Sequence, residues 1–368
     1  MELFSISQLQ EIIAEHYQIG KLVNYEQLLI GYENITYIIE TELNNSRSKY
    51  CFRRYNRARR EEDIQFEHSV INHLVSRGFD LTARIIKTID GRSYVKRLEG
   101  EDNRVGDVFY AIFDFLPGED KYIWYDPPTS REVLSNVAVV LARFHNATFD
   151  LNPAGQRDEP EIIEFIPTIA RQIEERAEAA GKTQFEICLL DNLSLFTDNI
   201  DRTLEAIDNK KYQELPHQVI HRDYHPGNLK FQNKRVTGLF DYDWTKIEAR
   251  CYDVAYAVTH FCTLWKGKQE GHLGLDKATT FLDSYQKTLK GSKGVVPLTQ
   301  VELRYLPHLI RAGIIYWVYW FIEDFYDTKT DSTAYPQFLE HYARIIRWLD
   351  NKDNWDTLEK ICAESAIS

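Results

Sequence analysis

The stretch VIHRDYHPGNLKF, residues 219–231, places two histidines, an arginine, an aspartate and an asparagine between two short apolar runs. A turn that joins two strands needs Gly, Pro, Asn or Asp for backbone reasons alone, and Pro226-Gly227-Asn228 would satisfy that need. The order of the other polar residues carries more information than the turn. It indicates a site where chemistry is done, within a segment of short strands.

His221, Arg222 and Asp223, followed by Asn228, fit the pattern H-R-D-x-x-x-x-N of a phosphoryl-transfer loop. Such a loop must hold an acceptor-orienting carboxylate and a metal ligand close together. In this interpretation Asp223 accepts the proton of an attacking hydroxyl, and the amide oxygen of Asn228 binds Mg²⁺. A well-placed general base is worth about 10²–10⁴ in rate.

A second acidic element, GLFDYDW at residues 238–244, places Asp241 thirteen residues after Asn228. An apolar strand that ends in aspartate delivers a carboxylate to a sheet edge, where it can hold Mg²⁺ against the phosphates of ATP. We assign that role to Asp241. Asp243 would point to the same side if the strand continued, which makes it an alternative metal ligand and a candidate for substrate contact.

Other residues around the loop are interpreted mainly as supports. Asp253 opens a helix, where it could cap the N-terminus or act as a buried acceptor that positions the loop. His221 and Arg222 are scaffold candidates, because Asp223 already supplies the base. For His225, contact with the substrate and simple loop packing both stay open.

From about Leu28 to Tyr256 the chain resembles the aminoglycoside phosphotransferase and choline kinase group of protein-kinase-like small-molecule kinases. HRDYHPGN, residues 221–228, matches that group's loop better than the Lys-Pro-Glu form typical of protein kinases, and Asp-Tyr-Asp replaces Asp-Phe-Gly. The runs GYENITY, KYCFRRY and RGFD…TIDG are most similar to the homoserine-kinase-like branch. The resemblance implies an α+β, protein-kinase-like two-lobe fold, with a small β-rich N-terminal lobe and a large helical C-terminal lobe.

The resemblance also implies an ATP site in the small lobe. The loop with Gly31 and Asn34 resembles the group's phosphate loop, although it has a single glycine. Arg53 stands where the group places a phosphate-binding Lys or Arg, and Glu67 on the following helix would pair with it. Strand alternation puts Arg53 and Arg54 on opposite faces, so only one can reach the nucleotide. Arg53 is preferred, with Arg54 as the alternative.

Residues 113–119 resemble the group's interlobe linker. The backbone of this linker, including Asp114 and Phe115, would read the edge of the adenine ring. The expected organisation is therefore a nucleotide-binding lobe at 1–112 and a helical lobe at 120–368, which carries the catalytic loop and the acceptor site.

Hydrophobic periodicity predicts the elements of both lobes. In the small lobe a hairpin is expected around Asn44-Asn45-Ser46, followed by a helix and further strands. In the large lobe the pattern is mainly helical. The expected small-lobe elements are strands at 37–41 and 49–55, a helix at 61–77 and strands at 83–88, 93–98 and 108–115. The expected large-lobe helices are 130–149, 162–180, 185–207, 276–289 and 303–326.

Composition restricts the class of protein further. With 368 residues, 43% of them hydrophobic, the chain is long enough for two cores. A net charge of −12 argues against non-specific binding to nucleic acid or to an anionic membrane. The five cysteines are scattered, which argues against a disulfide framework or structural zinc and favours the cytoplasm. No signal peptide or apolar run of about 18 residues is found.

The acceptor site is expected in the large lobe. The segment YWVYWFIEDFYD, residues 316–327, mixes aromatic and acidic residues. Aromatic faces and carboxylates suit an ammonium-bearing acceptor through cation–π contacts and ion pairs, which makes Glu323 and Asp324 candidates for substrate contact. The alternative, in which the aromatic residues are core and the acids a solvated face, is slightly favoured.

Together these residues predict an ATP- and Mg²⁺-dependent phosphotransferase. It would move the γ-phosphate to a hydroxyl of a small, amine-bearing metabolite of the homoserine, choline, ethanolamine or aminoglycoside type, which is cationic or zwitterionic. Two other interpretations are an atypical protein kinase and a non-catalytic nucleotide-binding module. The lack of an Ala-Pro-Glu segment argues against the first, and the complete set Asp223, Asn228 and Asp241 argues against the second.

Overall fold

The structure is a computed structural model that describes residues 5–28, 34–101, 104–328 and 334–365. The chain divides into two compact units, each with its own core. The first unit contains residues 1–118, 152–157 and 237–243, and the second contains residues 119–151, 158–236 and 244–368.

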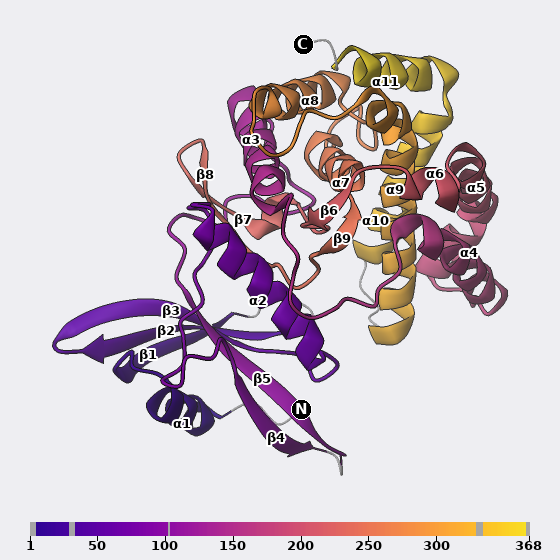
Figure 1. The fold of residues 1–368 in the computed structure, drawn as a ribbon. Helices are drawn as coiled ribbons and strands as arrows, with labels where there is room; N and C mark the ends of the chain where they lie inside the picture. Colours follow the sequence, from indigo (N-terminus) through magenta and orange to yellow (C-terminus); the bar gives the residue numbers. More distant parts are fainter. Residues whose placement is uncertain (1–4, 29–33, 102–103, 329–333, 366–368) are drawn as a thin grey trace. The chain divides into compact units, whose positions relative to one another are not determined.

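The first unit is built on an antiparallel sheet of five strands (Figure 1). α1 (Ile6–His16) begins with a capping box between Ser5 and Gln8, and its apolar face packs on the sheet face that carries Phe52. α2 (Glu61–Ser76) lies on the opposite face. The strands run in the order β1-β2-β3-β5-β4, where β1 is Lys21–Leu28, β2 is Ile35–Leu43, β3 is Ser46–Arg54, β4 is Val95–Glu101 and β5 is Arg104–Asp114.

Local sequence explains most of this unit. Asn44 and Asn45 both have positive φ, 52° and 64°, as a two-residue hairpin turn requires, so the predicted hairpin is confirmed. The helix expected at 61–77 is α2. The strand expected at 83–88 is wrong, because Thr82 bridges Leu239 while Ile85 bridges Phe113. With two different partners, the segment cannot form one continuous ladder.

A buried histidine on α2 ties the helix to the rest of the unit. His68 is 2% exposed; its Nε2 lies 3.0 Å from the Tyr55 hydroxyl and its Nδ1 lies 2.8 Å from Oγ of Ser93. Each hydroxyl can donate or accept, so both suit a neutral imidazole. Burial, helped by Arg53 and Lys87, lowers the pKa of His68 to about 3.

This pKa predicts a loss of stability in mild acid. In the unfolded chain the pKa of histidine is about 6.5, so between pH 6.5 and 3 the unfolded state binds a proton that folded His68 does not. Folding stability therefore falls as the pH drops below 6.5. At about 1.4 kcal/mol per pKa unit, His68 should cost about 2 kcal/mol at pH 5. Urea unfolding at pH 7 and pH 5, followed by circular dichroism, measures this loss.

The matched variant is His68→Gln, which keeps a donor and an acceptor but does not titrate. Its loss of stability between pH 7 and pH 5 should be smaller than that of the wild type by about 2 kcal/mol. His16→Gln, which removes a more exposed imidazole, should behave like the wild type. An equal acid loss in His68→Gln and wild type would contradict the prediction.

The second unit is mainly helical. α7 (Arg250–Cys262) is buried along its whole length, and α9 (Gln300–Thr328) packs against it (Figure 1). The other helices are α3 (Arg131–Thr148), α4 (Ile162–Glu178), α5 (Gln184–Ala206), α6 (Asn209–Gln213), α8 (Leu275–Leu289), α10 (Ala334–Asp350) and α11 (Lys352–Glu364). Two small sheets pair β6 (His217–Ile220) with β9 (Lys246–Ala249), and β7 (Leu229–Gln232) with β8 (Arg235–Leu239).

The five large-lobe helices that the sequence predicted correspond to α3, α4, α5, α8 and α9, each within three residues at either end. α10 and α11 were not predicted. α10 carries the signal plainly, since Leu339, Tyr342, Ile346 and Leu349 recur at helical spacing and are all buried.

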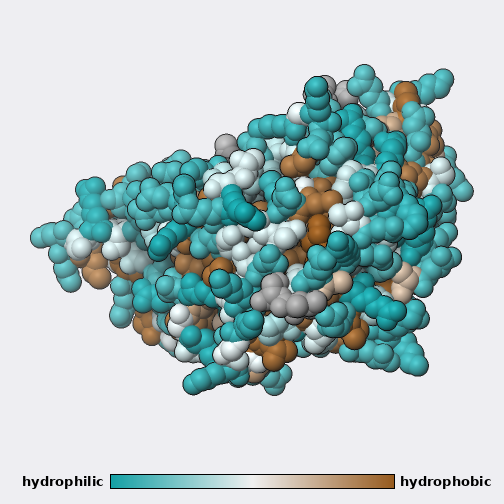
Figure 2. Space-filling model, turned by 90° about the horizontal axis from the view of Figure 1, so that it is seen from above, coloured by the Kyte–Doolittle hydropathy of each residue, from teal (hydrophilic) through white to brown (hydrophobic). Residues whose placement is uncertain are grey.

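The surface is dominated by polar side chains. The face seen in Figure 2 is mainly hydrophilic, with hydrophobic residues in small separate patches. Within the described part of the chain, no helix has the length and apolar character needed to cross a membrane.

Candidate active site

The loop of residues 221–228 joins β6 to β7 and is fixed by α7. Arg222 has a φ of 65°, a left-handed conformation that a non-glycine residue rarely adopts. Asp253, which is fully buried on α7, accepts the backbone N–H groups of His221 at 2.9 Å and Arg222 at 2.8 Å. Its Oδ2 also lies 2.9 Å from Nε2 of His145. Asp253 is thus the buried acceptor that the sequence predicted, and it does not cap α7.

Asp223 has hydrogen-bond donors on both carboxylate oxygens. The Tyr256 hydroxyl donates to Oδ1 at 2.8 Å, and Nδ2 of Asn228 donates to Oδ2 at 2.8 Å. The same amide nitrogen donates to the backbone carbonyl of Asp223 at 2.9 Å. Since both bonds of Asn228 use its nitrogen, its amide oxygen is the atom left to bind a metal.

His225 approaches the same carboxylate. Its Nδ1 accepts the N–H of Gly227 at 3.0 Å, so its proton is on Nε2, which lies 3.4 Å from Oδ2 of Asp223. A Cβ at position 227 would lie 2.9 Å from the imidazole, so only glycine leaves room for this arrangement. Burial alone would raise the pKa of Asp223, but His225 and Tyr256 hold it well below its usual range. The carboxylate is therefore ionised at neutral pH.

Tyr256 is a site residue that the sequence reasoning did not identify. It lies three residues after Asp253 on α7, so both side chains project from one face of the helix toward the loop. That spacing is the sequence signal that could have found it. Together, Asp223, His225, Asn228 and Tyr256 form what we call the Asp223 cluster.

In the first unit, Arg53 lies between two carboxylates. Its guanidinium donates to Oε1 of Glu67 at 3.1 Å and to Oδ1 of Asp241 at 3.3 Å. Burial would lower the pKa of Arg53, but Glu67 and Asp241 raise it well above its usual value, so the group stays charged. Arg54 instead pairs with Glu99 at 3.3 Å. Strand alternation thus separates the two arginines.

Asp241 and Asp243 differ in their surroundings. β8 ends at Leu239, so both aspartates lie beyond the strand, and the condition under which Asp243 would share the side of Asp241 is not met. Asp243 is 3% exposed and accepts from Nδ2 of Asn34 at 2.8 Å, with Arg59 at 3.6 Å. Burial alone would raise the pKa of Asp243, but the nearby charges of Arg53 and Arg59 bring this pKa below its usual value.

The Asp241 carboxylate is the more open of the two. Its side chain is 35% exposed, and its φ of 68° is a left-handed conformation that lifts it out of the strand direction. Within the described residues, no three His, Cys, Asp or Glu side chains group closely enough to bind a metal by themselves. Carboxylate and amide oxygens are nevertheless the ligands that Mg²⁺ prefers, and Mg²⁺ commonly takes its other ligands from phosphates and water. The Asp241 carboxylate and the Asn228 amide each offer an oxygen of this kind.

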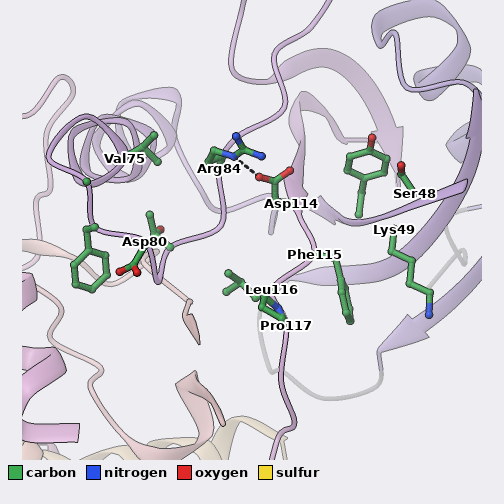
Figure 3. A pocket seen from close by; sticks show the side chains of 13 residues that line it. Ser48, Lys49, Val75, Asp80, Arg84, Asp114, Phe115, Leu116 and Pro117 are labelled. Atoms are coloured by element: carbon green, nitrogen blue, oxygen red, sulfur yellow. Dashed lines mark hydrogen bonds and ion pairs between the residues drawn. The ribbon is translucent and has the colours of Figure 1, made fainter. Parts of the chain in front are cut away.

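A pocket of about 650 Å³ borders the predicted linker in the first unit. Figure 3 shows Arg84 and Asp114 facing each other on its wall, with Phe115 and Lys49 beside them. Nε of Arg84 donates to Oδ2 of Asp114 at 2.5 Å, and the N–H of Asp114 donates to the Arg84 carbonyl at 2.9 Å. These groups of Asp114 are engaged within the chain. Arg53 does not line the pocket.

The other residues predicted for the phosphate loop and the acceptor site are not part of the Asp223 cluster. Gly31 is outside the described residues. Glu323 forms an ion pair with Arg176 at 2.6 Å, and Asp324 accepts a hydrogen bond from the Tyr335 hydroxyl. Both predicted acceptor-site carboxylates therefore have partners within the second unit.

Comparisons with known proteins find similarity over most of the chain. A model of the phosphotransferase enzyme family (APH) matches residues 24–277. A homoserine kinase of Parvibaculum lavamentivorans is 24% identical over 337 residues, which cover 90% of each protein. A homoserine kinase of Polaromonas naphthalenivorans is 23% identical over 336 residues, covering 89% of this chain and 91% of the relative.

Solved structures show the same fold at lower identity. A microcompartment-associated aminopropanol kinase matches with a TM-score of 0.68 and 14% identity, over 96% of this chain and 99% of its own. An amicoumacin kinase in complex with AMP-PNP and Ca²⁺ matches with a TM-score of 0.64 and 15% identity, over 93% of each chain. A choline kinase of Cryptosporidium parvum matches with a TM-score of 0.60 and 16% identity, over 95% of this chain and 98% of its own. The predicted protein-kinase-like fold is thereby confirmed.

Proposed function

Because this chain belongs to the phosphotransferase enzyme family, whose model matches more than half of it, we propose that it transfers the γ-phosphate of ATP, with Mg²⁺, to a hydroxyl of a small amine-bearing metabolite. That the chain is an ATP-dependent small-molecule kinase follows from the family and from its homoserine kinase relatives. The metal and the acceptor class are the proposed parts.

The geometry of Asp223 carries the proposal. Oδ1 receives one donor, the Tyr256 hydroxyl, and retains a lone pair for the proton of an acceptor hydroxyl. Because the carboxylate is held ionised, it can accept that proton at neutral pH. Asn228, whose nitrogen is bonded to Asp223, would offer its oxygen to the metal.

The first unit would contribute the phosphate-binding groups. Bound Mg·ATP supplies the phosphoryl group and offsets the charge that develops during transfer. Asp241 would hold the metal, and Arg53, held by Glu67, would donate to phosphate oxygens. Asn34 and Arg59 hold Asp243 in place, which favours a supporting role for Asp243.

A screen of acceptors tests the proposal directly. ADP release is measured with L-homoserine, 3-amino-1-propanol, ethanolamine, choline and an aminoglycoside, and the phosphorylated product is identified by mass spectrometry. We expect at least one of these compounds to be phosphorylated, with a requirement for Mg²⁺. Binding of Mg·ATP without transfer to any hydroxyl compound would contradict the proposal.

The role of Arg53 is tested by replacing each of the two neighbouring arginines in a separate variant. Arg53→Met, combined with Glu67→Gln so that no buried carboxylate loses its partner, should lower kcat/KM for ATP by roughly 10²–10³, the loss typical for one group that stabilises transition-state charge. Arg54→Met is the matched control, because it also removes a guanidinium from an ion pair on β3. The opposite result, a large loss only in Arg54→Met, would assign the phosphate contact to Arg54.

A further inference from the structure

Three aromatic side chains near the Asp223 cluster carry buried nitrogen atoms without a hydrogen-bond partner in the part of the chain that the structure describes. These atoms are Nδ1 and Nε2 of His260, Nε1 of Trp317 and Nε1 of Trp265. His260 is 1% exposed and Trp317 is 8% exposed. Buried polar groups are nearly always paired, so unpaired nitrogens on rings that pack in one connected series favour a bound molecule as their partner.

Packing connects these residues to Asp223. The ring of His260 lies 5.6 Å from that of His225 and 4.6 Å from that of Tyr256, both of which contact Asp223. His260 follows Tyr256 by four residues, so both lie on one face of α7. Trp317 comes from α9, which packs beside α7, and its ring is 4.9 Å from His260. The unpaired nitrogens thus begin one side chain away from the residues that bond Asp223.

Further aromatic rings connect Trp317 to the solvent-exposed surface. Trp124 stacks on Trp317, with centroids 5.7 Å apart and planes 13° apart, and its ring is 5.5 Å from that of Trp265. Trp124 and Trp265 are only half-buried, so this part of the wall reaches solvent. The ring of Phe321 lies 5.7 Å from that of Trp124. Ring faces of this kind attract an ammonium group.

The unpaired nitrogens need a partner other than an ammonium group. An indole N–H is a donor only. Burial, with His225, keeps the pKa of His260 well below its usual value, so this imidazole is neutral and offers one donor and one acceptor. An alkylammonium has no lone pair and could not satisfy the indole N–H groups. A carboxylate has two acceptor oxygens and could satisfy several of these donors at once.

We propose that His260, Trp317 and Trp265 bind the carboxylate of the acceptor, and that the enzyme therefore selects a hydroxy amino acid over an amino alcohol that lacks the carboxylate. The aromatic wall receives the ammonium group of the same acceptor. This inference rests on the proposed phosphotransfer and specifies its acceptor.

L-Homoserine and 3-amino-1-propanol test the inference, because they differ only by the carboxylate. The wild-type enzyme should prefer homoserine by at least about 100-fold in kcat/KM, since a site built to bond a polar group rejects the analogue without it. His260→Phe removes both ring nitrogens and should reduce that preference at least about tenfold, mainly by raising KM for homoserine. Trp317→Phe, which removes one N–H and keeps an aromatic ring, should reduce it in the same direction.

His308→Phe is the matched control. His308 is also an imidazole whose pKa burial lowers, to about 4, but it packs on Trp355, 5.0 Å away. This variant should keep the wild-type preference. Efficient transfer to 3-amino-1-propanol or choline, or an unchanged preference in both His260→Phe and Trp317→Phe, would overturn the assigned carboxylate site while phosphotransfer stands. No transfer to any acceptor would overturn both the site and the proposed function.

Discussion

Asp223→Ala should abolish most phosphotransfer while nucleotide binding is kept. The substitution removes the only carboxylate of the Asp223 cluster, and with it the group that accepts the hydroxyl proton. Loss of a positioned general base lowers the rate by about 10²–10⁴. Arg53 and Asp241, which we propose bind phosphate and metal, lie in the first unit, and Asn228 keeps its bond to the backbone carbonyl of residue 223, so the dissociation constant for Mg·ATP should change little. Single-turnover kinetics and calorimetry with Mg·ATP measure the two effects separately.

Asp223→Asn gives the sharper version of the experiment. Asparagine keeps the size of the side chain and an oxygen that Tyr256 can bond, but it is not a base. It should therefore be impaired about as much as Asp223→Ala, although it disturbs the loop less. Turnover at the wild-type rate in Asp223→Asn would show that Asp223 does not act as the base.

The sequence predicted the parts of the site that depend on local order along the chain. Asp223 and Asn228 lie on one short loop, so their spacing alone brings them together. The contact between Arg53 and Glu67 was also expected, because the resemblance to the family pairs these two residues, while strand alternation only separates Arg53 from Arg54. Such contacts need only the periodicity of an element and the order of its neighbours.

Contacts that depend on how helices pack could not be predicted in this way. His260 and Trp317 come from α7 and α9, and nothing in either segment specifies that their rings meet. The segment around Glu323 has the composition of a cation site, yet Glu323 pairs with Arg176 from another helix. The prediction of a strand at 83–88 was wrong for a related reason. The segment bridges two different parts of the folded unit, which its own sequence does not specify.

Asp253→Ala should destabilise the second unit and disorder the catalytic loop. Asp253 is the acceptor for two buried backbone N–H groups, those of His221 and Arg222, and alanine leaves both without a partner. Each unsatisfied buried donor costs about 1–3 kcal/mol, so the expected loss of folding free energy is about 2–6 kcal/mol. All seven tryptophans lie in the second unit, so urea unfolding followed by tryptophan fluorescence reports this unit specifically.

Activity should fall further than stability alone explains. The left-handed conformation of Arg222 persists because Asp253 holds its N–H, and without that bond the backbone of Arg222 can relax and carry Asp223 away from Tyr256. We therefore expect lower kcat in Asp253→Ala even where the protein is still folded. Asp276→Ala, which removes an exposed carboxylate near the start of α8, should change neither quantity by much, because its carboxylate loses little hydration on folding. Wild-type kcat in folded Asp253→Ala would show that the loop holds its conformation without this acceptor.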